Sequence, residues 1–226
     1  MLDPPFVSSS HPLSHTAASR LSASALACRR GSRLLFKNLD LDVDAGEIVW
    51  VRGQNGSGKT SLLRLIAGLS TPEHGRVLLD GIPVRSAAAH GRGLVYIAHA
   101  NALKEDLSVS EALEFLLRIH ARPCTPAIVQ AALERIGLLS RRQALVRTLS
   151  QGQRRRVALA RLAVDDGAAL WLLDEPFDAL DIDGIARLNG LLNDQVRRGG
   201  SVLLTSHLGV STATLRPREV DLDAYA

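Results

Sequence analysis

Apolar and polar positions follow two spacings along the chain, and each spacing predicts one kind of element. Residues 25–46 alternate apolar and polar side chains on both sides of Arg-Gly-Ser, which predicts a β-hairpin. Short apolar runs bounded by turn residues predict further strands, and these runs span 47–51, 75–81, 94–99, 169–174 and 201–206. We expect the runs at 47–51 and 94–99 to be buried strands, because polar residues do not alternate within them.

Between these strands the apolar spacing becomes helical. Residues 61–69 predict a helix with one apolar face, formed by Leu62, Leu63, Leu65, Ile66 and Leu69. A second helix is predicted over about 182–198, where two glycines close it. Strands that alternate with helices around a glycine-rich loop predict an α/β fold with a mainly parallel core sheet.

The middle of the chain is predicted to be mostly helical. Ser108 and Glu111 form the pattern of a capping box, which opens one helix. Thr125 and the proline after it begin another helix, which ends near Gly137. Residues 100–150 are therefore expected to form a helical lobe between two segments that are rich in strands.

Composition limits the classes of partner. The chain has 226 residues and 46% hydrophobic residues, which suits one large domain or a domain with a lobe. No apolar run approaches the roughly 18 residues that span a bilayer, so a membrane role requires a partner. The net charge of +4 is scattered and aromatic residues make up only 4%. These values favour a solvated arginine-rich surface, and we expect no nucleic-acid partner.

Two cysteines and the first residues carry little chemistry. Cys28 and Cys124 lie far apart and lack the spacing of metal ligands or of a haem attachment site, so we expect both to be reduced and structural. Residues 1–23 are rich in Ser, His and Ala and contain no apolar signal core. We expect them to form a disordered extension and not a targeting segment.

The segment GQNGSGKT, residues 53–60, lies between the strand at 47–51 and the helix at 61–69. Its glycines permit a tight turn that aims backbone N–H groups at phosphate oxygens, beside the positive end of a helix. Lys59 can reach the β and γ phosphates, and Thr60 can offer its hydroxyl to Mg²⁺. The segment therefore predicts a site for a nucleoside triphosphate, built from Gly53, Gln54, Asn55, Gly56, Ser57, Gly58, Lys59, Thr60 and Ser61.

Two later strands are predicted to end near the same site. LWLLDEP places Asp174 and Glu175 at the carboxyl end of a parallel strand, which is the ligand edge of such a sheet. There Asp174 would hold Mg²⁺, partly through water, and Glu175 would polarise an attacking water. His207 follows the strand at 201–206 and can hydrogen-bond the γ phosphate and the same water.

The segment LSQGQ, residues 149–153, admits two interpretations. Ser150 and Gln153 have the spacing of a capping box, which would be purely structural. Ser150 and Gly152 at a helix start also form an anion site, because a hydroxyl and free N–H groups converge there. The arginines at 154–156 are spread around the helix, so they form no single basic face.

GQNGSGKT, LSQGQ, LLDEP, Asp181 in DALD, and His207 occur in this order and resemble the nucleotide-binding subunit of ATP-binding cassette (ABC) transporters over residues 24–207. The resemblance implies an ABC ATPase fold with an antiparallel β subdomain and a helical lobe. It also implies ATP and Mg²⁺ as ligands, with Lys59, Glu175 and His207 acting in hydrolysis to ADP and phosphate. A head-to-tail homodimer would place Ser150, Gly152, Gln153 and Asp181 at the nucleotide, so that one subunit closes over ATP held by the other. A membrane permease would dock on the helical lobe at the cytoplasmic face of the inner membrane.

A narrower resemblance suggests the cargo. GKTSLLRLIAGL, GQRRRVALARL, LWLLDEPFDALD and GGSVLLTSH are similar to the ATP-binding subunits of haem exporters in cytochrome c maturation. His99 occupies the place where most cassettes have glutamine, and this subfamily tends to carry histidine there. Because Mg²⁺ prefers oxygen ligands, a contact through water or a relaying role suits His99 better than direct ligation. The expected function is ATP hydrolysis that energises the release of a haem-loaded chaperone.

Some alternatives stay open. An exporter of a lipid, drug or peptide would use the same motifs. A soluble cassette ATPase that acts on ribosomes or DNA generally has two cassettes or a long coiled-coil insertion, and this chain shows neither. A nucleotide-gated module without useful hydrolysis would account for His99. No aromatic residue precedes Leu34 where many cassettes stack adenine, so Arg29 or Arg30 is the candidate to cover the base. Residues 208–226 lose the resemblance, and we assign no role to them.

Overall fold

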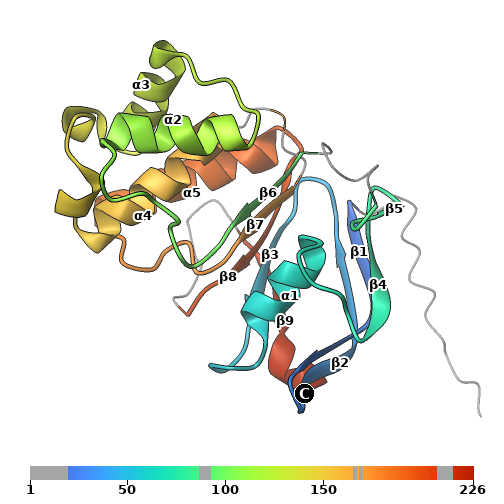
Figure 1. Ribbon diagram of the computed structural model, residues 1–226. Helices are drawn as coiled ribbons and strands as arrows, with labels where there is room; N and C mark the ends of the chain where they lie inside the picture. Colours follow the sequence, from blue (N-terminus) through green and yellow to red (C-terminus); the bar gives the residue numbers. More distant parts are fainter. Residues whose placement is uncertain (1–19, 87–92, 165–166, 168–169, 208–215) are drawn as a thin grey trace, which may run out of the picture.

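The computed structural model describes residues 20–86, 93–164, 167, 170–207 and 216–226. Two β-sheets lie on one side of the molecule and a group of helices lies on the other (Figure 1). This arrangement confirms the α/β prediction of a parallel core sheet, an antiparallel β subdomain and a helical lobe.

The antiparallel sheet has the strand order β2-β1-β4-β5. Its strands are β1 (Leu21–Arg30), β2 (Arg33–Val43), β4 (His74–Leu79) and β5 (Ile82–Pro83). The hairpin predicted within residues 25–46 is confirmed, since β1 and β2 pair in antiparallel register and turn at Gly31. The register shifts within this pairing, which gives the hairpin β-bulges.

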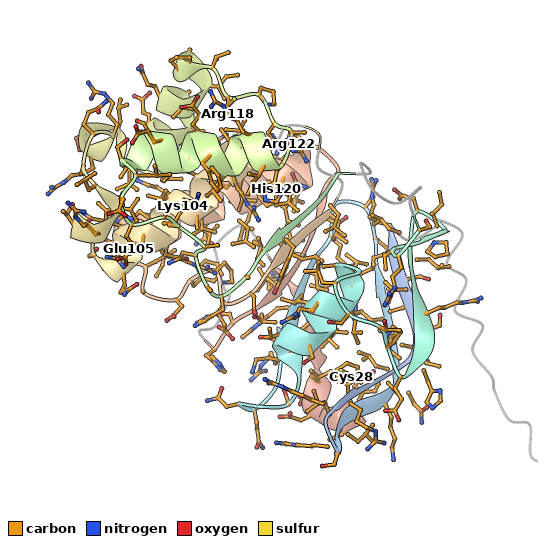
Figure 2. The ribbon with its side chains drawn as sticks, in the orientation of Figure 1. Cys28, Lys104, Glu105, Arg118, His120 and Arg122 are labelled. Atoms are coloured by element: carbon orange, nitrogen blue, oxygen red, sulfur yellow. The ribbon has the colours of Figure 1, made fainter. Side chains whose placement is uncertain are left out.

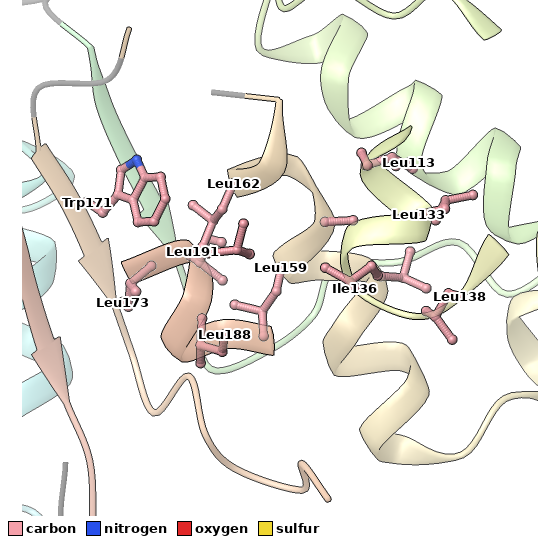
Figure 3. Close-up of a cluster of buried hydrophobic side chains, with 14 of the residues drawn as sticks. Leu113, Leu133, Ile136, Leu138, Leu159, Leu162, Trp171, Leu173, Leu188 and Leu191 are labelled. Atoms are coloured by element: carbon pink, nitrogen blue, oxygen red, sulfur yellow. The ribbon is translucent and has the colours of Figure 1, made fainter. Parts of the chain in front are cut away.

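The core sheet has the order β6-β7-β8-β3-β9, and all of its pairings are parallel. Its strands are β3 (Ile48–Arg52), β6 (Leu94–Ile97), β7 (Leu170–Leu173), β8 (Ser201–Thr205) and β9 (Arg218–Asp221). Because side chains alternate between faces, Trp171 and Leu173 pack toward the helical lobe, while Leu170 and Leu172 pack toward the other sheet. Two hydrophobic cores therefore share this one sheet. Figure 3 shows the core on the side of the helical lobe.

Helix α1 (Lys59–Ile66) packs between the two sheets and follows β3 directly through the glycine-rich loop. Leu62, Leu63, Leu65 and Ile66 are buried there, as the apolar spacing predicts. The prediction for Leu69 is wrong, because the helix ends before it and its side chain is 60% exposed.

The helical lobe contains α2 (Val109–Ile119), α3 (Pro126–Arg135) and α4 (Gln151–Leu159), and α5 (Ile182–Arg197) lies between this lobe and the core sheet. Short 3-10 turns occupy Leu139–Arg141, Val146–Thr148 and Ala160–Ala163. The caps predicted at Ser108 and Thr125 are confirmed, since each side chain accepts a backbone N–H of the first helical turn. The lobe boundary predicted at 150 is too early, because α4 packs against α2.

The predicted ends of the domain also need correction. The extension was expected to run to residue 23, but β1 begins at Leu21, whose side chain is fully buried. Residues 1–19 lie outside the described part of the chain. In the tail, β9 pairs with β3, and a 3-10 turn at Leu222–Tyr225 buries Leu222. The strand and turn within residues 218–225 therefore pack onto the core sheet and its hydrophobic core. Among the described helices, none has the length and apolar character that crossing a membrane would require.

Candidate nucleotide-binding site

The glycine-rich loop after β3 wraps around the side chain of Lys59. The ammonium of Lys59 donates hydrogen bonds to the backbone oxygens of Gly53 (2.8 Å) and Gln54 (3.1 Å), and the side chain is buried. Gly58 caps α1 at φ +109°, and a Cβ there would lie 3.1 Å from the Phe36 ring. A residue with a side chain would thus be strained and would push against β2, so the loop geometry requires glycine at this position.

Two threonine hydroxyls hold the first carboxylate at the end of β7. Thr60, on α1, donates to Oδ2 of Asp174 at 2.9 Å. Thr205, at the end of β8, donates to Oδ1 of the same carboxylate, also at 2.9 Å. Asp174 is only 1% exposed, so both oxygens of a buried charge are satisfied by hydroxyl donors.

The next carboxylate is paired with the histidine at the end of β8. The backbone N–H of His207 donates to Oε2 of Glu175 at 3.0 Å, and its ring Nε2 lies 3.3 Å from Oε1. The backbone N–H of Glu175 donates to the hydroxyl of Thr205 at 2.9 Å. The acids and the histidine therefore form one connected group at the carboxyl ends of adjacent parallel strands.

A cavity of about 420 Å³ joins this group to the phosphate loop. Its lining contains Arg30, Arg33, Leu35, Asn55, Gly56, Gly58, Lys59, Thr60, Ser61, His99, Asp174, Glu175 and His207. Cations lie on the loop side and carboxylates on the strand side, a distribution that suits a phosphate together with a divalent cation. Thr60 and Asp174 bring a hydroxyl and a carboxylate to this lining, and Mg²⁺ prefers oxygen atoms as ligands. In the described part of the chain, no group of three or more His, Cys, Asp or Glu side chains could hold a metal by itself.

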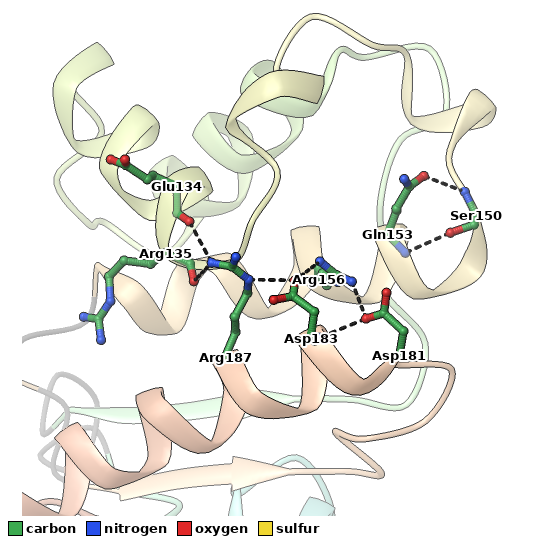
Figure 4. A network of polar contacts seen from close by, with 9 residues as sticks. Glu134, Arg135, Ser150, Gln153, Arg156, Asp181, Asp183 and Arg187 are labelled. Atoms are coloured by element: carbon green, nitrogen blue, oxygen red, sulfur yellow. Dashed lines mark hydrogen bonds and ion pairs between the residues drawn. The ribbon is translucent and has the colours of Figure 1, made fainter.

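A second set of predicted residues lies outside this cavity, on helices α4 and α5. Figure 4 shows the capping box of α4, in which the backbone N–H of Gln153 donates to Oγ of Ser150 (3.2 Å) and the backbone N–H of Ser150 donates to Gln153 Oε1 (3.1 Å). The capping box predicted at Ser150 and Gln153 is thus confirmed. The backbone of Gly152 packs closely against the backbone of Ala179, since a Cβ at Gly152 would lie 2.4 Å from the carbonyl oxygen of Ala179.

Asp181 caps the start of α5 and belongs to a polar network that includes Arg156 of α4 (Figure 4). Its carboxylate accepts the backbone N–H of Gly184 at 2.8 Å and pairs with Arg156. The hydrogen bond from Gly184 and the charge of Arg156 lower the pKa of Asp181. The carboxylate is thereby kept ionised as a helix cap. None of Ser150, Gly152, Gln153 and Asp181 lines the cavity of the same chain.

Arg155 of α4 reaches the nucleotide site, although no sequence motif marks this residue. Its side chain is 3% exposed and donates to the backbone oxygens of Ala98 (2.8 Å), Asp174 (2.6 Å) and Glu175 (2.9 Å). Burial lowers its pKa, an effect that the nearby carboxylates of Asp174, Asp178 and Glu175 oppose. The arginines of α4 do diverge as predicted, because Arg154 pairs with Glu105 and Arg156 with Asp181.

Two residues at the edges of the cavity, Arg33 and Asp223, were not predicted from the sequence. Arg33 lines it together with Arg30, whereas Arg29 is paired with Glu73 and does not belong to the lining. Of the two arginines expected to cover the base, only Arg30 therefore lines the cavity. At the back of the loop, Asp223 accepts the backbone N–H of Gln54 at 2.9 Å, which ties the tail to the phosphate loop.

Strand, glycine loop and helix, with two acids after β7 and a histidine after the adjacent parallel strand β8, define a nucleotide-binding protein of the phosphate-loop class. The family model described as ABC transporter matches residues 36–178. The chain therefore belongs to the ABC transporter family.

Curated relatives match almost the whole chain. The cytochrome c biogenesis ATP-binding export protein CcmA of Pseudomonas savastanoi pv. phaseolicola is 46% identical over 207 residues, 91% of this chain and 96% of that protein. The protein of the same name from Xanthomonas oryzae pv. oryzae is 44% identical over 212 residues, 94% of this chain and 98% of that protein. Among solved structures, a putative ABC transporter ATP-binding protein from Pyrococcus furiosus has a TM-score of 0.77 at 23% identity and covers 91% of this chain and 98% of that chain, which supports the fold alone.

Proposed function

We propose that this chain is the ATP-hydrolysing subunit of a membrane export complex that serves cytochrome c biogenesis. The observation that carries the ATPase assignment is a connected group at the end of the phosphate loop. It contains Thr60, Asp174, Thr205, Glu175 and His207, and all of them except Thr205 line one cavity together with loop residues. Hydrogen-bond donors for phosphate, oxygen ligands for a cation and a candidate base thus meet in one cavity.

The phosphate loop supplies charge and positioning. Lys59 donates to the loop's own carbonyl oxygens. With ATP in the cavity its ammonium exchanges these partners for β- and γ-phosphate oxygens, which attract a cation more strongly than neutral carbonyls do. The loop N–H groups and the start of α1 face the same phosphates. Mg²⁺, when bound, neutralises developing phosphate charge, and Thr60 and Asp174 are the residues that would hold it.

Glu175 and His207 act on the water and the γ phosphate. Glu175 is mostly buried, with its side chain 14% exposed, and its carboxylate lies beside the cavity. We assign it the role of the base that polarises the attacking water, which requires hydrogen-bond reach to that water. His207 orients this carboxylate through its backbone N–H and can turn its half-exposed ring to the γ phosphate. His99, which also lines the cavity, is assigned a relaying role through water.

The residues outside the cavity indicate a composite site. Ser150, Gly152 and Gln153 present the start of α4, and Asp181 presents the start of α5, away from the nucleotide cavity of their own chain. A head-to-tail homodimer would bring them to ATP held by the phosphate loop of the partner subunit. In that arrangement ATP joins the subunits, and hydrolysis lets them separate.

The test of the ATPase assignment is Glu175→Gln in the assembled complex with ATP and Mg²⁺. We expect turnover to fall about 100-fold or more, the usual effect of losing a general base, while ATP binding persists. Glu219→Gln, which removes an exposed carboxylate paired with Arg52, is the matched control and should keep wild-type turnover. Wild-type turnover in Glu175→Gln would remove Glu175 as the base.

A groove between the core sheet and α2 supports the assignment of a membrane partner. It encloses about 650 Å³, and its lining is largely apolar, with Leu69, Leu94 and Leu116 among its residues. His120 and Arg122 lie at the end of α2 that borders the groove (Figure 2). We assign this groove to a cytoplasmic segment of the permease, which would hold the chain on the inner face of the inner membrane.

Two exposed apolar residues provide a matched test of this docking site. Leu69, at the groove, is 60% exposed, and Ile182, at the start of α5, is 88% exposed. Leu69→Asp should release the chain from membranes that contain the complex, whereas Ile182→Asp should leave it attached. Equal retention of both variants on the membranes would contradict the groove as the docking site.

The cargo assignment is supported by the names of the curated relatives, which are cytochrome c biogenesis export proteins. We propose that turnover energises release of a haem-loaded chaperone on the far side of the membrane. The alternative is another exported cargo, such as a lipid, drug or peptide. Co-purification from the native membrane separates the two, because a permease outside the haem pathway would defeat the haem assignment.

A further inference from the structure

Thr205 lies at the point where two strands deliver their ends to the nucleotide cavity. It is the last residue of β8 and is fully buried. Strands β7 and β8 pair with Leu173 opposite Leu204, so the next positions, Asp174 and Thr205, are adjacent. The strand end is anchored, because the Trp50 indole donates to the backbone oxygen of Ser206 at 3.0 Å.

One hydroxyl connects both carboxylate residues. Thr205 donates to Oδ1 of Asp174 at 2.9 Å and accepts the backbone N–H of Glu175 at 2.9 Å. A hydroxyl has one proton and two lone pairs, so it can fill both roles together. The side chain therefore acts on the direction of the Asp174 carboxylate and on the orientation of the peptide that carries Glu175.

The peptide held by Thr205 has an unusual conformation. Glu175 adopts φ +47°, a left-handed backbone that a residue with a long side chain rarely takes. Such a conformation persists only where neighbouring contacts hold it in place, and these residues gather at functional sites. The bond from the Glu175 N–H to Thr205 and the bond from Arg155 to the Glu175 carbonyl fix the two ends of this residue.

The hydroxyls of Thr60 and Thr205 both donate to Asp174, but we expect only one of these hydrogen bonds to persist when substrate binds. Under the proposed function, Thr60 would hold the cation with its hydroxyl oxygen and would then no longer donate to Oδ2 of Asp174. Thr205 stays on Oδ1, because its strand is anchored in the sheet. Thr205 is then the protein contact that keeps this carboxylate aimed at the cavity.

We propose that Thr205 is a positioning residue of the ATPase reaction, a role that rests on the proposed function of this site. Its hydroxyl holds the Asp174 carboxylate in the direction that serves the cation and holds the Glu175 peptide in the conformation that aims the base at water. It touches neither substrate nor the reacting atoms and acts through its two neighbours.

The test compares Thr205→Val with Thr205→Ser in the full chain, assembled with its membrane partner. Valine keeps the shape of threonine and removes the hydroxyl, whereas serine keeps the hydroxyl. Ser201→Ala is the matched control, because Ser201 is a buried residue of the same strand whose hydroxyl donates to the Asp44 backbone oxygen at 2.6 Å, at the opposite end of β8. If the valine variant does not fold, Thr205→Ala replaces it, since alanine introduces no new volume.

Turnover and binding are measured separately. For Thr205→Val we expect kcat to fall about 10- to 100-fold, the effect of misaligning reacting groups, with KM for ATP within about twofold because the Lys59 contacts are unchanged. Binding of a fluorescent ATP analogue, titrated with Mg²⁺ without turnover, should need about fivefold more Mg²⁺, the effect of one lost hydrogen bond. Thr205→Ser should restore both values, and Ser201→Ala should change neither.

Three results would overturn the positioning role of Thr205. Wild-type kcat and Mg²⁺ dependence in Thr205→Val would overturn the positioning role, and so would a serine variant as defective as the valine variant. A loss of kcat that Ser201→Ala shares would show a general effect of strand stability and would overturn it as well. If the wild-type complex itself shows no ATP turnover, the proposed function fails, and the Mg²⁺ titration still tests the contact between Thr205 and Asp174.

Discussion

Replacement of Arg155 by methionine tests how far the buried guanidinium holds the site together. Arg155 extends from α4 to the loop after β6 and to the end of β7, where it donates to backbone oxygens of Ala98, Asp174 and Glu175. Methionine fills much of the same volume but has no donor. The carbonyl oxygens would then be left unpaired in a region that water reaches poorly.

The expected cost follows from these contacts. The loss of a buried charged partner destabilises a protein by about 3–5 kcal/mol, and each unpaired buried carbonyl accounts for about 1–3 kcal/mol of such a loss. For a chain of this size, 1 kcal/mol corresponds to about 2–4 °C in Tm. We therefore expect Arg155→Met to lower Tm by about 6–20 °C. Lysine has donors but a different geometry, so Arg155→Lys should lie in between.

The assay is thermal unfolding followed by circular dichroism, with Arg154→Met as the control. Arg154 precedes Arg155 on the same helix, but it pairs with Glu105, whose side chain is 63% exposed. A pair with an exposed partner contributes about 1 kcal/mol or less, and the hydrogen bond from Arg154 to the backbone oxygen of Arg147 contributes about 1 kcal/mol. Tm of the control should therefore fall less than that of Arg155→Met. If Arg155→Met melts together with Arg154→Met, the carbonyl contacts do not stabilise the fold and the reasoning is refuted.

Two further predictions concern the edges of the site. Asp223→Ala removes the acceptor of the Gln54 N–H and should weaken ATP binding about 3- to 10-fold, measured with a fluorescent analogue. Glu219→Ala is the control and should leave the affinity unchanged. Unchanged affinity in Asp223→Ala would contradict a role for the tail. At the groove, burial and the charges of Arg161 and Arg122 lower the pKa of His120. The neutral imidazole therefore contributes stability to the fold at pH values above the usual pKa of histidine, and this contribution is lost as the pH falls below that pKa. Between about pH 7 and pH 5 the Tm of the wild type should therefore fall more than that of His120→Gln, and parallel curves would contradict this linkage.

The strands, helices and caps of the chain could be predicted because short-range patterns determine them. The run at 47–51 and the runs before Asp174 and His207 are continuous and apolar, since each strand is buried on both faces. Parallel strands deliver their carboxyl ends to one edge, so the meeting of these acids with His207 also followed from the order of the elements.

Contacts that depend on distant backbone atoms could not be predicted in this way. The partners of Arg155 are backbone carbonyl oxygens from loops far away in sequence. Every residue type carries the same carbonyl, so the sequence does not reveal which one accepts a hydrogen bond. Strand β9 was missed because it lies at the edge of the sheet with mostly exposed polar side chains, and only Val220 packs against the core. For Thr205 a signal existed, because pairing Leu173 with Leu204 places its hydroxyl beside Asp174.

The composite site is the central claim, and sedimentation of Glu175→Gln with ATP and Mg²⁺ tests it most directly. A chain that binds ATP without hydrolysing it should sediment as a dimer, and adding Ser150→Arg should return it to the monomer by blocking the partner's nucleotide. Thr125→Arg removes an equivalent helix cap on the lobe and should leave the dimer intact. A protein that stays monomeric with ATP, or that dimerises equally well with Ser150→Arg, would contradict the composite site.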